Sequence, residues 1–142
     1  MILIDANLLI YAVNRDAPSH TKAKAWLESV IEGTETVAFS WTVLLAFLRL
    51  TTKAGLFRKP LTVKQACDLI DAWLEPPIAV ILEPGSNHRK QLRKMLLSLG
   101  VGGNLTSDAH LAALAIEHEA ELCTADDDFA RFEGLRWRNP LK

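Results

Sequence analysis

Residues 106–129, TSDAHLAALAIEHEAELCTADDDF, hold the pattern that decides the fold. They read as a polar turn, a helix with an apolar stripe, a very short strand at Glu121 to Cys123, and an acidic turn. Asp108 opens the predicted helix, and the run from Asp126 to Asp128 follows the predicted strand. The segment therefore predicts one helix–strand unit with a carboxylate position at each boundary.

A third carboxylate stands at the other end of the sequence. Met1 to Ile4 is a continuous apolar run, typical of a buried parallel strand, and Asp5 closes it. The carboxyl ends of parallel strands meet at one edge of a sheet, so acids far apart in sequence can converge there. Converging carboxylates repel one another unless a cation joins them, and Mg2+ prefers all-oxygen sites. We therefore expect an acidic metal site at the top of an α/β sheet.

The rest of the chain alternates strand and helix with short connections. Further strands are predicted at residues 36–39, 78–82 and 135–137. Further helices are predicted at residues 8–13, 20–32, 41–52, 63–74, 88–100 and 129–132. This order predicts a three-layer α/β/α sandwich with a central, mainly parallel sheet, formed by residues 1–142 as a single domain.

Composition narrows the class of protein. Apolar residues make up 49% of the 142 residues and charged residues 23%, which is ordinary for a globular chain. The net charge of −1 provides no global attraction for nucleic acid or an anionic membrane. Cys67 and Cys123 form neither a disulfide framework nor a zinc-ligand spacing, so both are predicted to be buried in a reducing compartment. The N-terminus is a poor signal peptide, and we expect a soluble, cytoplasmic protein without membrane contact.

Each acid also has a purely structural interpretation. Asp5 can cap the helix that follows it, and Asp108 suits the positive end of a helix dipole. The run of three acids can be a solvated turn with at least one member facing solvent. His110 and His118 are placed on the polar side of the central helix, without a metal-ligand partner at helical spacing. The combination of acids therefore carries the metal hypothesis, and no single acid does.

Two groups of basic residues could bind a polyanion. Arg89, Lys90, Arg93 and Lys94 lie with His88 on the polar side of one predicted helix, although such a cluster is more often a solvated face. Arg49, Lys53, Arg58 and Lys59 form a second group. If the acids act on a phosphodiester, one group should flank them and contact backbone phosphates.

Three segments together resemble a PIN-domain protein, specifically a VapC-type toxin ribonuclease: MILIDANLLIYAVNRD, SWTVLLAFLRLTT and GNLTSDAHLAALAIEHEAELCTADDDFARFEGLRWRNP. The resemblance covers essentially the whole chain. The last segment is the most specific, because an Asp starts an Ala-rich helix and a short strand ends in Thr-x-Asp-x-Asp-Phe. The resemblance implies a PIN fold, Mg2+- or Mn2+-dependent RNA cleavage, a VapB-like antitoxin as partner, and homodimer formation.

The resemblance also implies roles for individual residues. The family acids match Asp5, Asp108 and Asp126, which are then the catalytic residues and the metal ligands. Asp128 is the other candidate for the third acid. Asn7, Ser107, Thr124 and Asp128 are candidates for substrate binding or for support of the site, with Thr124 at a hydroxyl position and Ser107 beside Asp108.

One family feature is missing. The helix after the second strand usually carries a Glu, whereas SWTVLLAFLRLTT contains no acid, and residues 44–46 are Leu, Leu and Ala. The pocket is therefore less negative than usual. The alternative function is a catalytically weakened PIN-fold module that binds RNA or an antitoxin. A phosphatase with an Asp after its first strand is a weaker rival, because Asn7 stands where its second Asp belongs.

Overall fold

Strand β1 (Ile2–Ile4) lies at the centre of a five-stranded sheet in this computed structural model, which describes residues 1–142. The strand order is β3-β2-β1-β4-β5, and every neighbouring pair is parallel. The other strands are β2 (Val37–Phe39), β3 (Ala79–Ile81), β4 (Glu121–Cys123) and β5 (Trp137–Arg138). The carboxyl ends of β1 and β4 are therefore neighbours, which brings the two ends of the sequence together.

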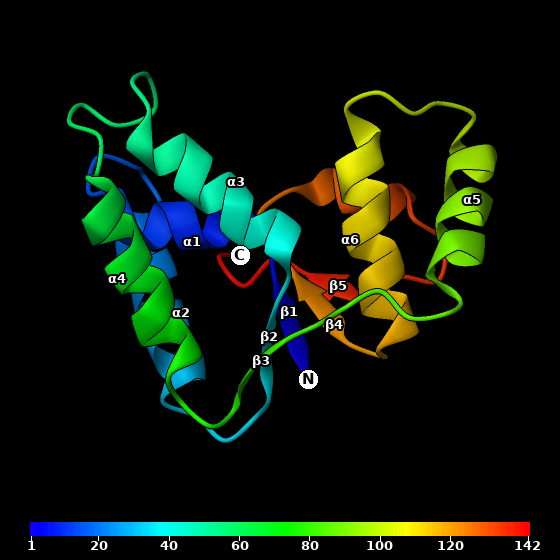
Figure 1. Cartoon of the computed structure of the whole chain (residues 1–142), viewed down its shortest axis with the longest axis horizontal. Helices are drawn as coiled ribbons and strands as arrows, with labels where there is room; N and C mark the ends of the chain where they lie inside the picture. The colour runs from blue at the N-terminus through cyan, green and yellow to red at the C-terminus, as the bar shows by residue number, and fades with distance from the viewer.

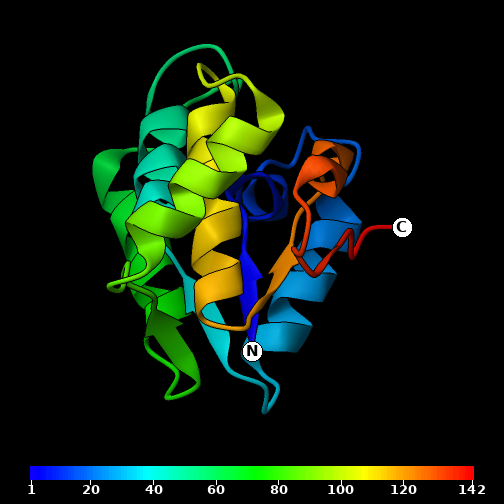
Figure 2. The same cartoon turned by 90° about the vertical axis from the view of Figure 1, so that its right-hand side faces the viewer.

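Six α-helices and one short 3-10 helix, η1 (Asp127–Arg131), connect the strands. The α-helices are α1 (Ala6–Val13), α2 (His20–Ile31), α3 (Trp41–Thr52), α4 (Val63–Leu74), α5 (His88–Leu99) and α6 (Leu105–Glu117). Helices α1 to α4 gather on one side of the strands and α5 and α6 on the other (Figure 1), and Figure 2 shows the second side face on. The predicted three-layer α/β/α sandwich is confirmed.

Local capping explains where several helices begin and end. The Ser40 hydroxyl accepts a hydrogen bond from the Val43 N–H at 3.2 Å and starts α3 directly after β2. Thr62 and Gln65 form a reciprocal capping box at the start of α4. Gly100, with φ of +72°, ends α5 in the left-handed region that favours glycine.

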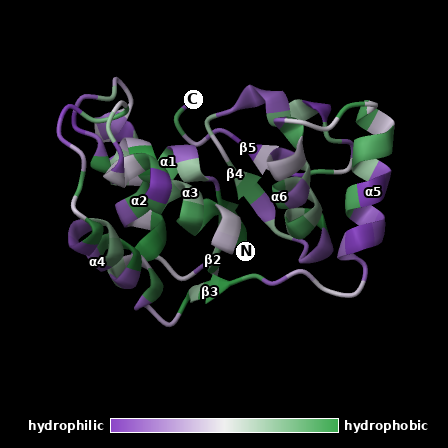
Figure 3. Ribbon diagram, turned by 45° about the horizontal axis from the view of Figure 1, so that its top comes forward, coloured by the Kyte–Doolittle hydropathy of each residue, from purple (hydrophilic) through white to green (hydrophobic).

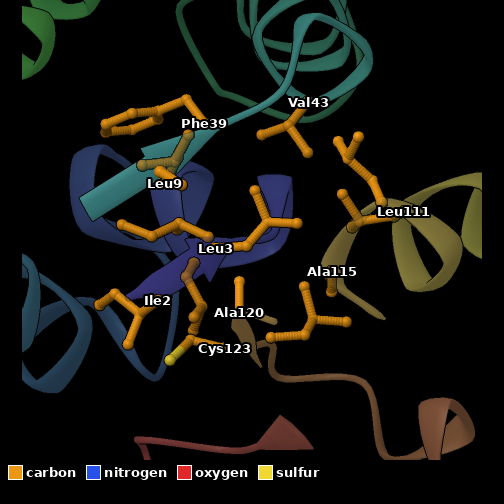
Figure 4. Packing of buried hydrophobic residues seen from close by; sticks show 14 of the residues in the cluster. Ile2, Leu3, Leu9, Phe39, Val43, Leu111, Ala115, Ala120 and Cys123 are labelled. Atoms are coloured by element: carbon orange, nitrogen blue, oxygen red, sulfur yellow. The ribbon is translucent and has the colours of Figure 1, made fainter. Parts of the chain in front are cut away.

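The core lies between the sheet and both helical layers. Ile2, Leu3 and Ile4 of β1 are completely or almost completely buried, because β1 has a strand on each side and a helix layer on each face. Figure 4 shows Leu3 between Leu9 and Phe39 on one side and Ala115 of α6 on the other. This packing fixes the position of α6 relative to β1. The predicted site depends on that position, because β1 ends just before Asp5 and the first turn of α6 contains Asp108.

Two predicted boundaries were wrong at the end of the chain. The last strand was expected at residues 135–137, but β5 is Trp137–Arg138, because the Leu135 N–H still donates to the Phe132 carbonyl in the preceding turn. The short helix η1 spans Asp127–Arg131, so it begins two residues and ends one residue earlier than predicted, because Asp126 caps it by accepting from the Asp128 N–H.

Helix α6 also begins earlier than expected. Its first residue is Leu105, so Asp108 is the fourth residue of the helix rather than its opening residue. The Leu105 and Thr106 N–H groups donate to the carbonyls of Gly102 and Gly103, which starts the helical turn before the polar residues are reached.

The burial of Cys67 was also predicted wrongly. Cys67 is exposed, because the apolar face of α4 consists of Ala66, Ile70 and Trp73, one turn apart, and Cys67 falls beside it. Cys123 is buried as expected, and both cysteines are free. None of the helices has the length and apolar character needed to cross a membrane.

Candidate active site

Asp5 is both a helix cap and the centre of a polar cluster. Its Oδ1 accepts from the Ala6 N–H at 2.7 Å, so the capping interpretation holds. Its Oδ2 accepts from the Thr124 hydroxyl at 2.7 Å and from the Asn7 amide at 3.3 Å. Burial raises the pKa of Asp5; the hydrogen bonds from Thr124 and Ala6 oppose that rise, and the Asp126 carboxylate adds to it. Capping and site formation therefore use different oxygens of one carboxylate.

The Thr124 hydroxyl joins β1 to the segment after β4. Thr124 is fully buried. Its oxygen donates to Asp5 and accepts from the Asn7 amide at 3.2 Å and the Asp126 N–H at 3.0 Å. The side-chain Oδ1 of Asn7 in turn accepts from the Ala125 N–H at 3.2 Å. This network fixes the backbone before Asp126 against the first turn of α1, although more than 115 residues separate the two in sequence.

The three consecutive acids have different surroundings. Asp126 is partly buried and caps η1 with one carboxylate oxygen. Asp127 is exposed and pairs with Lys142. Asp128 is exposed and lies 3.5 Å from the Arg131 guanidinium. Asp126 is thus the member of the run that belongs to the Thr124 cluster, whereas Asp128 lies at its rim.

Asp108 approaches the same acids from α6. Burial, together with repulsion from Asp5 and Asp126, raises the pKa of Asp108 to about 6. Asp128 adds to the rise, and the Arg131 guanidinium opposes it. No hydrogen bond from the protein reaches the Asp108 carboxylate. The structure therefore brings the acids that follow β1 and β4 near Asp108 of α6, where only the Arg131 guanidinium opposes the repulsion on the Asp108 carboxylate.

Arg131 is the site residue that the sequence analysis missed. It follows the acidic run by three residues, and its Nε donates to the Asp128 carbonyl at 3.0 Å. The signal in the sequence was the spacing from Asp128 to Arg131, which allows an ion pair on one helical turn. The two clusters of Arg and Lys that the sequence analysis singled out, on α5 and near the end of α3, do not contribute to the pKa shift of Asp5 or Asp108.

Two other predicted features contribute little to the cluster. Ser107 is exposed, and its hydroxyl forms no hydrogen bond with Asp108. Helix α3 supplies no acid: Leu44 is buried, Leu45 is 56% exposed and Ala46 is partly buried. The acids that affect Asp5 and Asp108 all come from β1, α6 and the segment after β4.

The donor chemistry of this cluster fits a hard divalent cation. The carboxylate donors are all oxygens, and the pKa of Asp108 is raised by burial and by repulsion from Asp5 and Asp126, which the Arg131 guanidinium opposes only in part. No three His, Cys, Asp or Glu side chains lie close enough together to hold one ion directly. Mg2+ normally binds through one or two carboxylates and keeps several waters, so its sites need no complete cage of protein ligands.

A second polar cluster lies between α5 and α6. His88 is buried, contrary to its predicted place on the polar face of α5, because its ring packs edge-on against that of His110. His88 Nε2 lies 2.9 Å from His110 Nδ1, and His88 Nδ1 lies 3.3 Å from the Glu117 carboxylate. His110 is therefore not on a free polar side of α6, and burial lowers its pKa. His118 caps the end of α6, and its Nε2 contacts the Glu83 carbonyl at 2.8 Å.

Comparisons with known proteins identify the family. A family model described as PIN domain matches residues 2–135. Ribonuclease VapC37 of Mycobacterium tuberculosis is 46% identical over 140 residues, which are 99% of this chain and 97% of that protein. Ribonuclease VapC33 of the same species is 37% identical over 142 residues, with coverage of 100% and 99%.

Solved structures share the fold at lower sequence identity. A chain of the VapBC2 structure from Rickettsia felis, bound to a DNA fragment from its promoter, superposes with a TM-score of 0.70 at 23% identity, covering 98% of both chains. Mycobacterium tuberculosis VapC20, described as a sarcin-ricin loop cleaving toxin, superposes with a TM-score of 0.69 at 17% identity, covering 96% of this chain and 99% of that one.

Proposed function

This chain belongs to the PIN-domain family, and we propose that it hydrolyses RNA phosphodiester bonds through Asp5, Asp108 and Asp126, with residues 1–142 forming a single PIN domain. It is an endoribonuclease of the VapC type, the toxin of a toxin–antitoxin system, like the relatives that align with nearly all of it. The observation that carries the assignment of the site is the meeting of carboxylates from three segments. Thr124 ties Asp5 to the backbone of Asp126, and Asp108 of α6 lies near both, with its pKa raised to about 6 by burial and by their repulsion.

Asp5, Asp108 and Asp126 would hold a divalent metal together, one or two of them as direct ligands and the rest through metal-bound water, with Mg2+ as the preferred ion and Mn2+ as the alternative. When bound, the ion supplies Lewis-acid chemistry, which activates water and offsets the charge on phosphate oxygens. The chain's own contribution is to orient the ligands. Thr124 holds one oxygen of Asp5 and Ala6 the other, so that carboxylate keeps a single orientation.

The remaining site residues support or extend this arrangement. Asn7 and Thr124 act as positioning residues, because they fix Asp5 and the backbone before Asp126. Asp128 stays at the rim, where its pair with Arg131 keeps a cation beside the acids. Arg131 can then contact a phosphate of the substrate, since a guanidinium binds phosphate oxygens in pairs. We assign Ser107, which is exposed, to substrate contact rather than to support of Asp108.

The missing acid on α3 defines the alternative, a PIN-fold module that binds without cutting. A cleavage assay separates the two functions. Purified protein is incubated with structured RNAs and Mg2+ or Mn2+, beside controls with EDTA and with Asp5→Asn. We expect cleavage that both controls abolish. A folded protein that cuts no RNA with either metal would favour the alternative, and a Glu introduced at residues 44–46 would then test the role of the absent acid.

Partners and location complete the proposal. A VapB-like antitoxin is the expected protein partner, and RNA the substrate. A homodimer would cover Trp41 and Leu45, which are 50% and 56% exposed and lie one turn apart on α3. We place the protein in the cytoplasm, where two free cysteines remain reduced. Light scattering of the wild type and of Leu45→Glu would test the dimer: the variant should be monomeric.

A further inference from the structure

A groove runs between α5, α6 and the segment that begins with η1. Its volume is about 530 Å³. Met95 and Phe132 form part of its floor and are almost fully buried. Lys94 and Ser98 line the rim on α5, and both are exposed. The groove is therefore an open channel with an apolar floor and a cation on one edge.

Arg131 connects this groove to the acids of the site. It lines the groove on the η1 side, next to Glu133, and pairs with Asp128 at 3.5 Å. Its charge also acts on Asp108 of α6. A strand of nucleic acid that lay in the groove would therefore contact Arg131, which pairs with Asp128 at the rim of the carboxylate cluster.

The charge on α5 is unusual for a helix whose role is only structural. Arg89, Lys90, Arg93 and Lys94 have no carboxylate within 4.0 Å, and the helix contains no acid. Figure 3 shows α5 as one of the most hydrophilic helices. Arg89 and Lys90 lie in its first turn, where cations oppose the helix dipole. Arg89–Arg93 and Lys90–Lys94 are also like-charge pairs four residues apart, which destabilise a helix.

We propose that this groove binds a single-stranded part of the RNA substrate beside the cleavage site, with Lys94 and Arg131 contacting backbone phosphates on its two edges. The inference rests on the proposed ribonuclease function. The groove is complementary to both the backbone and the bases of RNA. Its cations attract the phosphates, and its apolar floor can stack against the face of a base. The other three cations of α5 raise the local potential without lining the groove.

Charge reversals on adjacent residues of α5 test the groove. Lys94→Glu alters the rim, whereas Arg93→Glu makes the same change in charge on an exposed residue that does not line it. Both are made in an Asp5→Asn background, and binding of a fluorescein-labelled single-stranded oligoribonucleotide is measured by anisotropy. We expect Lys94→Glu to weaken binding roughly tenfold and to lower the salt slope by at least about 0.7, as for the loss of one phosphate contact. Arg93→Glu lowers the local potential without removing a phosphate contact, so it should weaken binding only about twofold to threefold, clearly less than Lys94→Glu.

A steric pair tests the same groove without changing charge. Ser98→Trp places a ring in the channel, and Leu97→Trp places one on the neighbouring residue, which is 65% exposed and does not line it. Only Ser98→Trp should weaken RNA binding and raise the KM for cleavage. Circular dichroism and thermal melting verify that all four variants are folded.

The outcomes separate this inference from the proposed function. If the wild type cleaves RNA but the members of each pair behave alike, the groove is not the RNA path, and the ribonuclease function stands. If Lys94→Glu and Ser98→Trp weaken binding selectively while the wild type cuts no RNA, the groove stands as an RNA site and the proposed catalysis fails. Loss of binding to an antitoxin peptide, with RNA binding unchanged, would also overturn the inference.

Discussion

The two ends of α6 each carry a partly buried carboxylate, and the protein treats them in opposite ways. Glu117, the last residue, accepts from the Gly85 N–H at 2.9 Å with one oxygen and lies 3.3 Å from His88 with the other. Asp108, in the first turn, accepts no hydrogen bond from the protein and is surrounded by Asp5, Asp126 and Asp128. Burial of a charge normally requires partners: Glu117 has hydrogen-bond partners, whereas Asp108 has none, and only the nearby Arg131 charge opposes the repulsion from the other acids.

The difference distinguishes a carboxylate that serves the fold, Glu117, from one that we assign to the proposed site, Asp108. The cluster around Glu117 ties α5 to α6 and to the loop before α5, so its interactions are complete within the protein. The cluster around Asp108 keeps carboxylates close together, and the proposed divalent cation would offset their repulsion. A group of acids held together against its own repulsion therefore marks a site better than any single acid does.

Asp5→Asn should reduce RNA cleavage as strongly as any substitution proposed for this site. The variant keeps an oxygen that can accept from the Ala6 N–H, so α1 remains capped. It loses the charge, and we expect cleavage to fall at least about a hundredfold. A cleavage time course beside a thermal melt provides the check, since a variant that loses activity only because it unfolds would make Asp5 structural.

Thr124→Val should damage both the fold and the site. It removes a buried hydroxyl that serves Asp5, Asn7 and Asp126, and we expect a loss of about 2 kcal/mol in the free energy of unfolding, together with slower cleavage. Thr51→Val is the matched control, because Thr51 is equally buried but donates only to the Phe47 carbonyl within α3. Urea unfolding and cleavage rates compare the two; equal activities would remove Thr124 from the site.

Asp108→Asn should stabilise the metal-free protein while it abolishes cleavage. Because the folded-state pKa of Asp108 is raised from 3.8 to about 6, the wild type loses stability as pH rises between about 4 and about 6, when the carboxylate ionises. Its solvent-facing side reduces the effect, so we expect a gain of about 1 kcal/mol at pH 7.

Unfolding measured in EDTA at pH 4 and pH 7 tests this expectation. The gain should appear at pH 7 and vanish at pH 4, where Asp108 is largely protonated in the wild type. Addition of Mg2+ should stabilise the wild type more than the variant. Asp71→Asn, at an exposed position of α4, is the control and should behave like the wild type throughout.

Glu117→Gln should have the smallest effect on stability and cleavage, which would separate the role of Glu117 from that of Asp108 at the other end of α6. The amide oxygen still accepts from the Gly85 N–H, and only the charge beside His88 is lost, so we expect a destabilisation of about 0.5 kcal/mol. RNA cleavage should match the wild type. A large drop in cleavage by a stable variant would connect the α5–α6 cluster to catalysis and undo the distinction between the two ends.

The sequence by itself determined the elements whose signals are local. Helix α4 was predicted at its observed residues, because Thr62 caps it and Pro76 and Pro77 prevent its continuation. The parallel sheet followed from alternating apolar strands and helices. Because the carboxyl ends of parallel strands lie at one edge of a sheet, the sequence was enough to predict that Asp5 and the acids after β4 belong to one site.

Only the tertiary structure decided which side chains meet. It distinguished Asp126 in the Thr124 cluster from Asp128 at the rim, added Arg131 to the site, buried His88 against His110 and exposed Cys67. It also moved β5 to Trp137, where pairing with Leu122 begins. Backbone propensity and capping act over a few neighbouring residues, whereas these outcomes depend on contacts between elements that are distant in sequence.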